Sequence, residues 1–195
     1  MRGSGGRHRE LHSAERIAPP RGRRDSSDLS LLRGCHRGSW RGPRDAVEGA
    51  VIMFRLDSIA PNLAESFRHA TPAHRRKATL VACTLVVSWV GLEGEEVVAA
   101  LEHLRHGGEG DRELLRKIES LAARLDDEYL RLDEEGNETK RPEVLRLFSK
   151  ARAASALGFA LSEDPGQLHE ALYEALVAVD DATEVIRPVA EALRN

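Results

Sequence analysis

Aromatic residues are scarce in this sequence. Only 4% of the 195 residues are Phe, Trp or Tyr, whereas hydrophobic residues as a whole make up 41%. The core must therefore be built mainly from Leu, Val and Ala, and a chain rich in Leu, Ala, Glu and Arg favours helix. The length is enough for one domain of ordinary size. The composition therefore predicts a single-domain, all-α helical bundle.

Cysteines and long apolar runs are also few. Two cysteines, Cys35 and Cys83, do not suggest a disulfide framework, which favours a reducing compartment and a cytoplasmic location. No apolar segment follows the basic N-terminus, as a secretory signal would require. The longest uncharged run, 78–92, covers 15 residues, whereas a membrane-spanning helix needs about 20. We therefore expect no contact with a membrane and interpret this run as a buried central helix.

Charge divides the chain into two regions. Residues 1–52 contain 11 arginines, no lysine and six acidic residues, a net charge of +5, whereas residues 53–195 contain 18 basic and 26 acidic residues, a net charge of −8. The first region is rich in Gly, Ser and Pro and lacks apolar periodicity, so it cannot offset the entropy of ordering. We expect a disordered basic tail at 1–52, either genuine or upstream of a true start near Met53, and an α-helical domain at 53–195. A genuine tail could serve as a nucleic-acid arm or a targeting peptide.

Helix signals follow one another from Asp57 onwards. Thr71 and Asp111 are residue types that begin helices, and Gly91 is a type that ends them. Pro188 is expected to end or kink the last long helix. These signals predict about six helices, at about 57–69, 72–90, 95–106, 112–133, 142–161 and 167–187, with a short last turn to residue 193.

Acidic side chains on the last long helix are the first candidate for chemistry. Glu170, Glu174, Asp181 and Glu184 project within about 40° of one direction at about 100° per residue. Carboxylates spaced along helices can hold Mg²⁺, so Glu170, Glu174 and Asp181 are the candidate metal ligands of a metal-dependent all-α nucleotide hydrolase. The opposite face carries a full apolar stripe. The favoured interpretation is therefore a solvated acidic face, with no metal and no cofactor.

Arg152 is the second candidate. It falls on one helix face with Leu145 and Phe148, where a buried guanidinium needs a carboxylate partner or a water-filled pocket. Glu128, at the edge of the preceding helix's apolar stripe, is the expected partner, and Tyr129 could add a hydrogen bond. The favoured interpretation is a buried ion pair that fixes helix register. The alternative is a small-ligand-binding pocket at Arg152, with Glu128 and Tyr129 in its wall.

Recognisable catalytic motifs are missing. The chain has no Gly-x-Gly-x-x-Gly, no P-loop, no His-Glu-x-x-His, no Cys-x-x-Cys and no nucleophile-elbow serine. A helix-turn-helix interpretation of 72–90 and 95–106 fails on charge. Its recognition helix would carry three glutamates against one arginine, the wrong sign for a phosphate backbone. We therefore expect no nucleic acid to be bound by the folded domain.

Binding of another protein is the favoured function. The support is the lack of a catalytic constellation together with an acidic helical domain, which suits a basic partner electrostatically. Bacterial immunity proteins and antitoxins that neutralise basic nucleases have these properties, an analogy of kind and not of sequence. No family's set of motifs matches the chain residue by residue, and the oligomeric state does not follow from the sequence.

Overall fold

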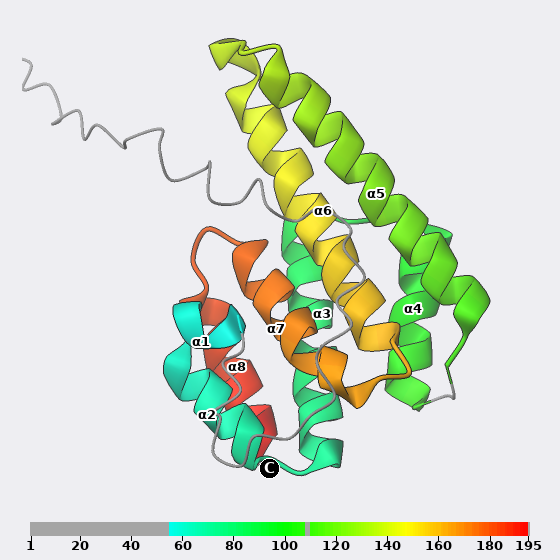
Figure 1. Ribbon diagram of the computed structural model, residues 1–195, viewed down its shortest axis with the longest axis vertical. Helices are drawn as coiled ribbons and strands as arrows, with labels where there is room; N and C mark the ends of the chain where they lie inside the picture. The colour runs from blue at the N-terminus through cyan, green and yellow to red at the C-terminus, as the bar shows by residue number, and fades with distance from the viewer. Residues whose placement is uncertain (1–54, 108–109, 195) are drawn as a thin grey trace, which may run out of the picture. The chain divides into compact units, whose positions relative to one another are not determined.

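The computed structural model describes residues 55–107 and 110–194, and all regular elements within these ranges are helices (Figure 1). The predicted all-α fold is confirmed, with eight α-helices and two short 3-10 helices in the described part instead of about six helices. The tail expected at 1–52 lies outside the described residues. The α-helices are α1 (Arg55–Ile59), α2 (Pro61–His69), α3 (Pro72–Val90), α4 (Glu95–His106), α5 (Arg112–Glu134), α6 (Arg141–Leu161), α7 (Leu168–Val177) and α8 (Thr183–Arg194), and the 3-10 helices are Glu138–Lys140 and Pro165–Gln167.

Local capping residues set the ends of α3, α4 and α5. The Thr71 hydroxyl accepts a hydrogen bond from the His74 N–H at 3.2 Å. One carboxylate oxygen of Asp111 accepts the N–H groups of the second and third residues of α5. Gly91 and Gly107 adopt φ values of 60° and 66° after α3 and α4, in the left-handed region that suits glycine. The predicted helix starts and stops are therefore correct where the signal is local.

Two predicted helices are each divided in the structure. The first breaks at Ala60 because Pro61, which has no N–H to donate, occupies the first position of α2. The last predicted helix divides because α7 ends at Val177 and α8 begins at Thr183, whose backbone N–H donates to the Asp181 carboxylate at 2.9 Å. Asp181 therefore precedes a new helix, and the expected continuous helix over 167–187 is wrong.

Pro188 lies inside α8 and does not end it. It removes one intrahelical hydrogen bond, in the second turn. The buried side chains Val185, Val189, Ala192 and Leu193 hold this helix against α3 and α2. Burial on that face therefore outweighs the single lost bond. Of the two expected effects of Pro188, to end or to kink the helix, the first is wrong.

Helix α3 is central, as predicted, because it contacts α4, α6, α7 and α8. Ala78 and Val86 are fully buried along one side of it. The helix is not enclosed all the way round, since Leu85 is only half-buried and Trp89 is 46% exposed. The uncharged run at 78–92 therefore contributes one buried face rather than a helix covered on all sides.

The antiparallel pair α5 and α6 extends beyond the rest of the domain. Figure 1 shows the distal ends of these helices, with their connection, reaching past α3 and α7. We call residues 126–150 the arm. A small second core of Leu132, Val144 and Leu147 holds the arm together. None of the helices in the described ranges is both long and apolar enough to cross a membrane.

Candidate functional site

Five charged side chains form a continuous network across α1, α7, α6 and α5. Nη1 of Arg55 lies 3.0 Å from Oε2 of Glu170 and 3.1 Å from Oε1 of Glu174. The other oxygen of Glu174 lies 3.1 Å from Nη1 of Arg152, whose Nη2 contacts both carboxylate oxygens of Asp126. We call these five residues the charge network. Glu174 is its centre because it joins the two arginines.

Burial and charge act in opposite directions at Glu174, which is 2% exposed. Burial raises the pKa of this carboxyl group, against the pull of Arg152 and Arg55. At Arg55 burial acts to lower the pKa, but Glu174 and Tyr173 favour the cation, and the pKa is raised overall. The Arg55 guanidinium also lies 3.9 Å from the centre of the Tyr173 ring. The network thus binds α1 to α7 by charge and stacking together.

The expectation that Glu174 belongs to a solvated face is wrong. Helix α7 contacts α6, α3 and α1. These helices cover both the apolar side of α7, which its periodicity identifies, and part of its polar side. Glu174 and the half-buried Glu170 consequently lie between elements. Asp181 and Glu184 are exposed and lie beyond the end of α7, so the four acids do not form one face.

The predicted requirement for a carboxylate beside Arg152 is met, but not by Glu128. Its partners are Asp126 and Glu174, whereas Glu128 is exposed. Two helix positions correspond to a rotation of about 200°, so Asp126 and Glu128 lie on opposite flanks of α5. The spacing from Asp126 to Tyr129 could have identified the correct flank, because residues three apart share one side of a helix.

Tyr129 and Arg152 both lie near the ring of Phe148. Its ring packs against Phe148 with centroids 5.4 Å apart, and the Arg152 guanidinium carbon lies 5.6 Å from the Phe148 ring centre. Arg152 and Tyr129 are thus both near the Phe148 ring, and the hydrogen bond expected between them stays a prediction. Arg55 was missed as a member of the network, since no periodicity in the sequence indicates that α1 packs on α7.

The three candidate metal ligands do not converge. Glu170 and Glu174 face arginine, and Asp181 accepts the Thr183 N–H before α8. Among the described residues, no group of three or more His, Cys, Asp or Glu side chains is arranged to hold a metal ion. Arg55 and Arg152 neutralise Glu170 and Glu174, so these ion pairs hold neighbouring helices together.

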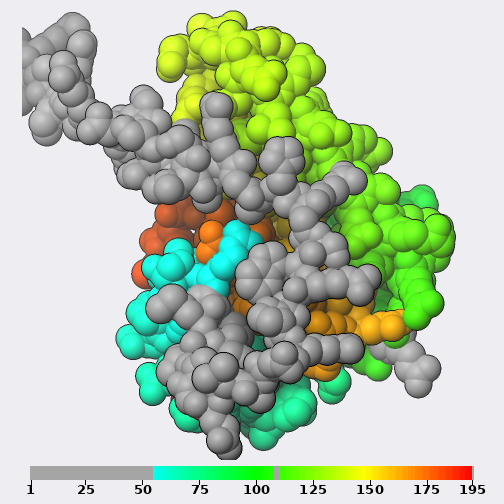
Figure 2. Space-filling model, viewed as in Figure 1, coloured from blue at the N-terminus to red at the C-terminus, as the bar shows by residue number. Residues whose placement is uncertain are grey.

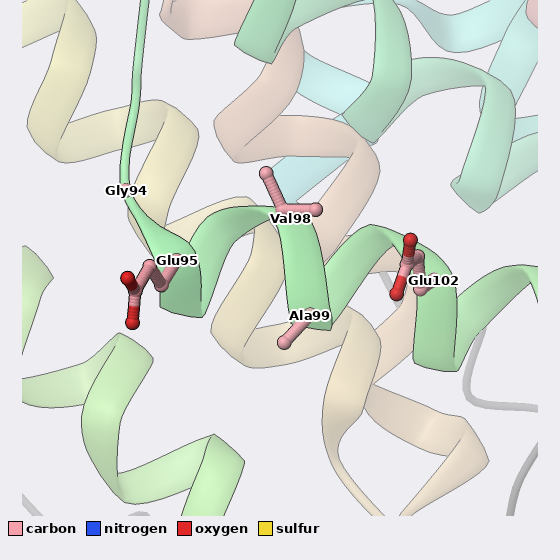
Figure 3. Close-up of a pocket in the computed structure, with 5 residues that line it drawn as sticks. All are labelled: Gly94, Glu95, Val98, Ala99 and Glu102. Atoms are coloured by element: carbon pink, nitrogen blue, oxygen red, sulfur yellow. The ribbon is translucent and has the colours of Figure 1, made fainter.

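A separate surface feature lies along α4. An open hollow of about 530 Å³ is lined by Gly94, Glu95, Val98, Ala99 and Glu102. Figure 3 shows Val98 and Ala99 between the two glutamates on one helix. Val98 is 57% exposed, although it is a large apolar side chain. We call these five residues the α4 surface.

No protein-family model matches the chain, and no curated protein or solved structure matches it either. Function must therefore be argued from the geometry of the charge network, the arm and the α4 surface.

Proposed function

We propose that the helical domain is a protein-interaction module that binds a basic segment of another protein on the α4 surface. The observation that carries the proposal is the 57% exposed Val98 between Glu95 and Glu102. Protein interfaces commonly combine an apolar centre with a polar rim whose charge complements the partner. An amphipathic helix with basic flanks has the matching chemistry.

The acidic residues of this surface have two different explanations. Glu95 lies in the first turn of α4, where a carboxylate stabilises the helix by interacting with its dipole. Glu102 lies two turns later, beyond the reach of that effect. Its position on the same exposed side as Glu95 and Val98 therefore supports a role in binding rather than in helix stability.

The net charge of −8 over residues 53–195 favours a basic partner more generally. Immunity proteins and antitoxins are cytoplasmic examples of acidic modules with basic protein targets, and we place this chain in that functional class by analogy. The small-ligand alternative at Arg152 and the metal-dependent hydrolase alternative at Glu170 have no comparable support. Their charged groups already contact one another within the charge network.

A binding titration tests this proposal. The probe is a fluorescein-labelled amphipathic peptide of leucine and lysine, and binding to the full chain is followed by fluorescence anisotropy. We expect saturable binding that weakens about tenfold, equivalent to about 1.4 kcal/mol, in the Val98→Glu variant and in the Glu95→Lys/Glu102→Lys variant. Added salt should weaken binding further because it screens the charges.

Matched controls separate a specific surface from general acidity. The variant Glu65→Lys/Glu191→Lys changes the net charge equally at two exposed glutamates outside α4 and should bind like the unmodified chain. A peptide of leucine and glutamate should not bind. Equal loss of binding in both double variants, or no loss in either, would show that the α4 surface is not the binding site.

A further inference from the structure

The exposed side of α4 carries its charges in a definite order. Glu95, Val98, Glu102 and Arg105 are all exposed and follow one another at spacings of 3, 4 and 3 residues, so they lie within about 80° of one direction. From the start of the helix to its end, this line is negative, apolar, negative and positive. His106 is exposed in the same turn as Arg105, and its Nδ1 donates to the Glu102 backbone carbonyl at 2.8 Å. The last turn therefore places a cation, and no anion, at one end of the α4 surface.

The charged side chains of this line are not used within the fold. In the part of the chain that the structure describes, Glu95, Glu102 and Arg105 make no ion pair and no side-chain hydrogen bond. By contrast, Arg116 and Arg131 on the exposed side of α5 each pair with a glutamate of the same helix. The three charges on α4 are therefore available to a partner.

A helical partner can meet all four positions at once. Spacings of 3 and 4 residues keep a line of side chains against a neighbouring helix over successive turns. Charge complementarity then requires a basic residue opposite each glutamate, an apolar residue opposite Val98 and an acidic residue opposite Arg105. A helix that is basic along its whole length would place like charges together at Arg105.

The direction of the partner follows from its own helix dipole. In an antiparallel partner the acidic residue comes first, near the N-terminus, and the basic residues follow toward the C-terminus. Both positions are favourable, because acidic side chains stabilise the start of a helix and basic side chains stabilise its end. A parallel partner would carry the same residues in the reverse order, with both kinds of charge at the unfavourable end.

We propose that the α4 surface selects an amphipathic helix that runs antiparallel to α4 and carries an acidic residue opposite Arg105. Along the partner, the order is acidic, basic, apolar and basic at spacings of 3, 4 and 3 residues. Arg105 is the specificity-determining residue, because it rejects a helix whose charges are all basic. This inference rests on the binding proposed for the α4 surface and adds the pattern and direction of the partner.

Two fluorescein-labelled peptides of identical composition test the pattern. In the matched peptide, a glutamate stands three residues before the first lysine. In the shifted peptide, this glutamate and an alanine two positions later are exchanged, which turns the carboxylate by about 200° to the opposite side. Binding to the full chain is followed by fluorescence anisotropy in about 0.15 M salt, which screens distant charges. We expect the matched peptide to bind about fivefold more tightly. Circular dichroism must show equal helix content in the two peptides.

A charge reversal on the protein assigns this preference to one residue. Arg105→Glu should make the shifted peptide the tighter ligand, because a carboxylate then faces the glutamate of the matched peptide. Arg146→Glu is the matched control, since it makes the same change of charge at an exposed arginine of the arm, the lobe where the α5 and α6 colours meet in Figure 2. This variant should still prefer the matched peptide.

The outcomes separate this inference from the binding on which it rests. Equal affinity of the two peptides, or a preference that survives Arg105→Glu, would overturn the role of Arg105. Sensitivity of both peptides to Val98→Glu would then still support binding at the α4 surface. Tighter binding of a matched peptide with its sequence reversed would overturn the antiparallel direction. If neither peptide binds, both the inference and the proposed function are wrong.

Discussion

Nη1 of Arg152 lies 3.1 Å from Oε2 of Glu174, although helical periodicity alone places Glu174 toward solvent. The other oxygen of Glu174 lies 3.1 Å from Nη1 of Arg55. One buried carboxylate therefore holds helices α1 and α6 to α7. Charges buried in this way stabilise a fold only as a complete set, because removing one member leaves the others without compensation. The charge network is consequently sensitive to conservative substitution of any one member.

Replacement of Arg152 by Met should lower the free energy of unfolding by about 3 kcal/mol at neutral pH. The arginine side chain is only 13% exposed, and its loss leaves Glu174 buried with Arg55, whose side chain is 40% exposed. Urea unfolding provides the measurement. Arg116→Met is the matched control on the exposed side of α5 and should change the value by less than about 0.5 kcal/mol. Equal effects of the two variants would mean that the network is not structural.

The partner of Arg152 can be identified by a double-mutant cycle. Arg152→Met combined with Asp126→Asn should be non-additive by about 1 kcal/mol, because the two groups contact each other directly. The same arginine variant combined with Glu128→Gln should be additive within about 0.5 kcal/mol, since Glu128 lies on the other flank of α5. Coupling to Glu128 and additivity with Asp126 would restore the pairing expected from the sequence.

The raised pKa of Glu174 predicts a defined pH dependence. A carboxyl group with a higher pKa in the folded state binds its proton more tightly there than in the unfolded chain, where the ordinary value is 4.5. Its contribution to stability is therefore complete below pH 4.5 and is lost as the pH rises through the folded-state pKa. Other carboxylates, such as Glu170, have lowered pKa values and act in the opposite direction.

Subtracting a variant isolates the Glu174 contribution. The unfolding free energy of the unmodified chain, minus that of Glu174→Gln, should decrease as the pH is raised from 4.5, because only one of the two proteins can lose this proton. Chemical unfolding at a series of pH values gives the difference. An increase with pH would mean that the two arginines outweigh burial and hold the pKa of Glu174 below its ordinary value.

The parts of the fold that could be predicted depend on contacts within a few residues. Thr71, Gly91 and Asp111 fix helix ends through hydrogen bonds or dihedral angles of their own neighbourhood, so their roles follow from sequence. The need of Arg152 for a carboxylate also followed, from the apolar side chains beside it. The burial of Glu174 could not be predicted in this way. It results from packing of α7 against three other helices, and the periodicity of a single helix does not indicate which helices lie beside it.

The faces of α3 lead to the last prediction. Val86 is fully buried, whereas its neighbour Leu85 is half-buried. Val86→Ala should therefore cost about 2 kcal/mol, from lost apolar burial and the cavity left behind. Leu85→Ala should cost about 1 kcal/mol although it removes more atoms, because solvent or neighbouring side chains can fill the half-open site. Urea unfolding of both variants gives the comparison. A larger loss for Leu85→Ala would mean that another molecule covers the open side of α3 in solution. Repeating the measurement at several protein concentrations would reveal such a contact, because its contribution to stability rises with concentration.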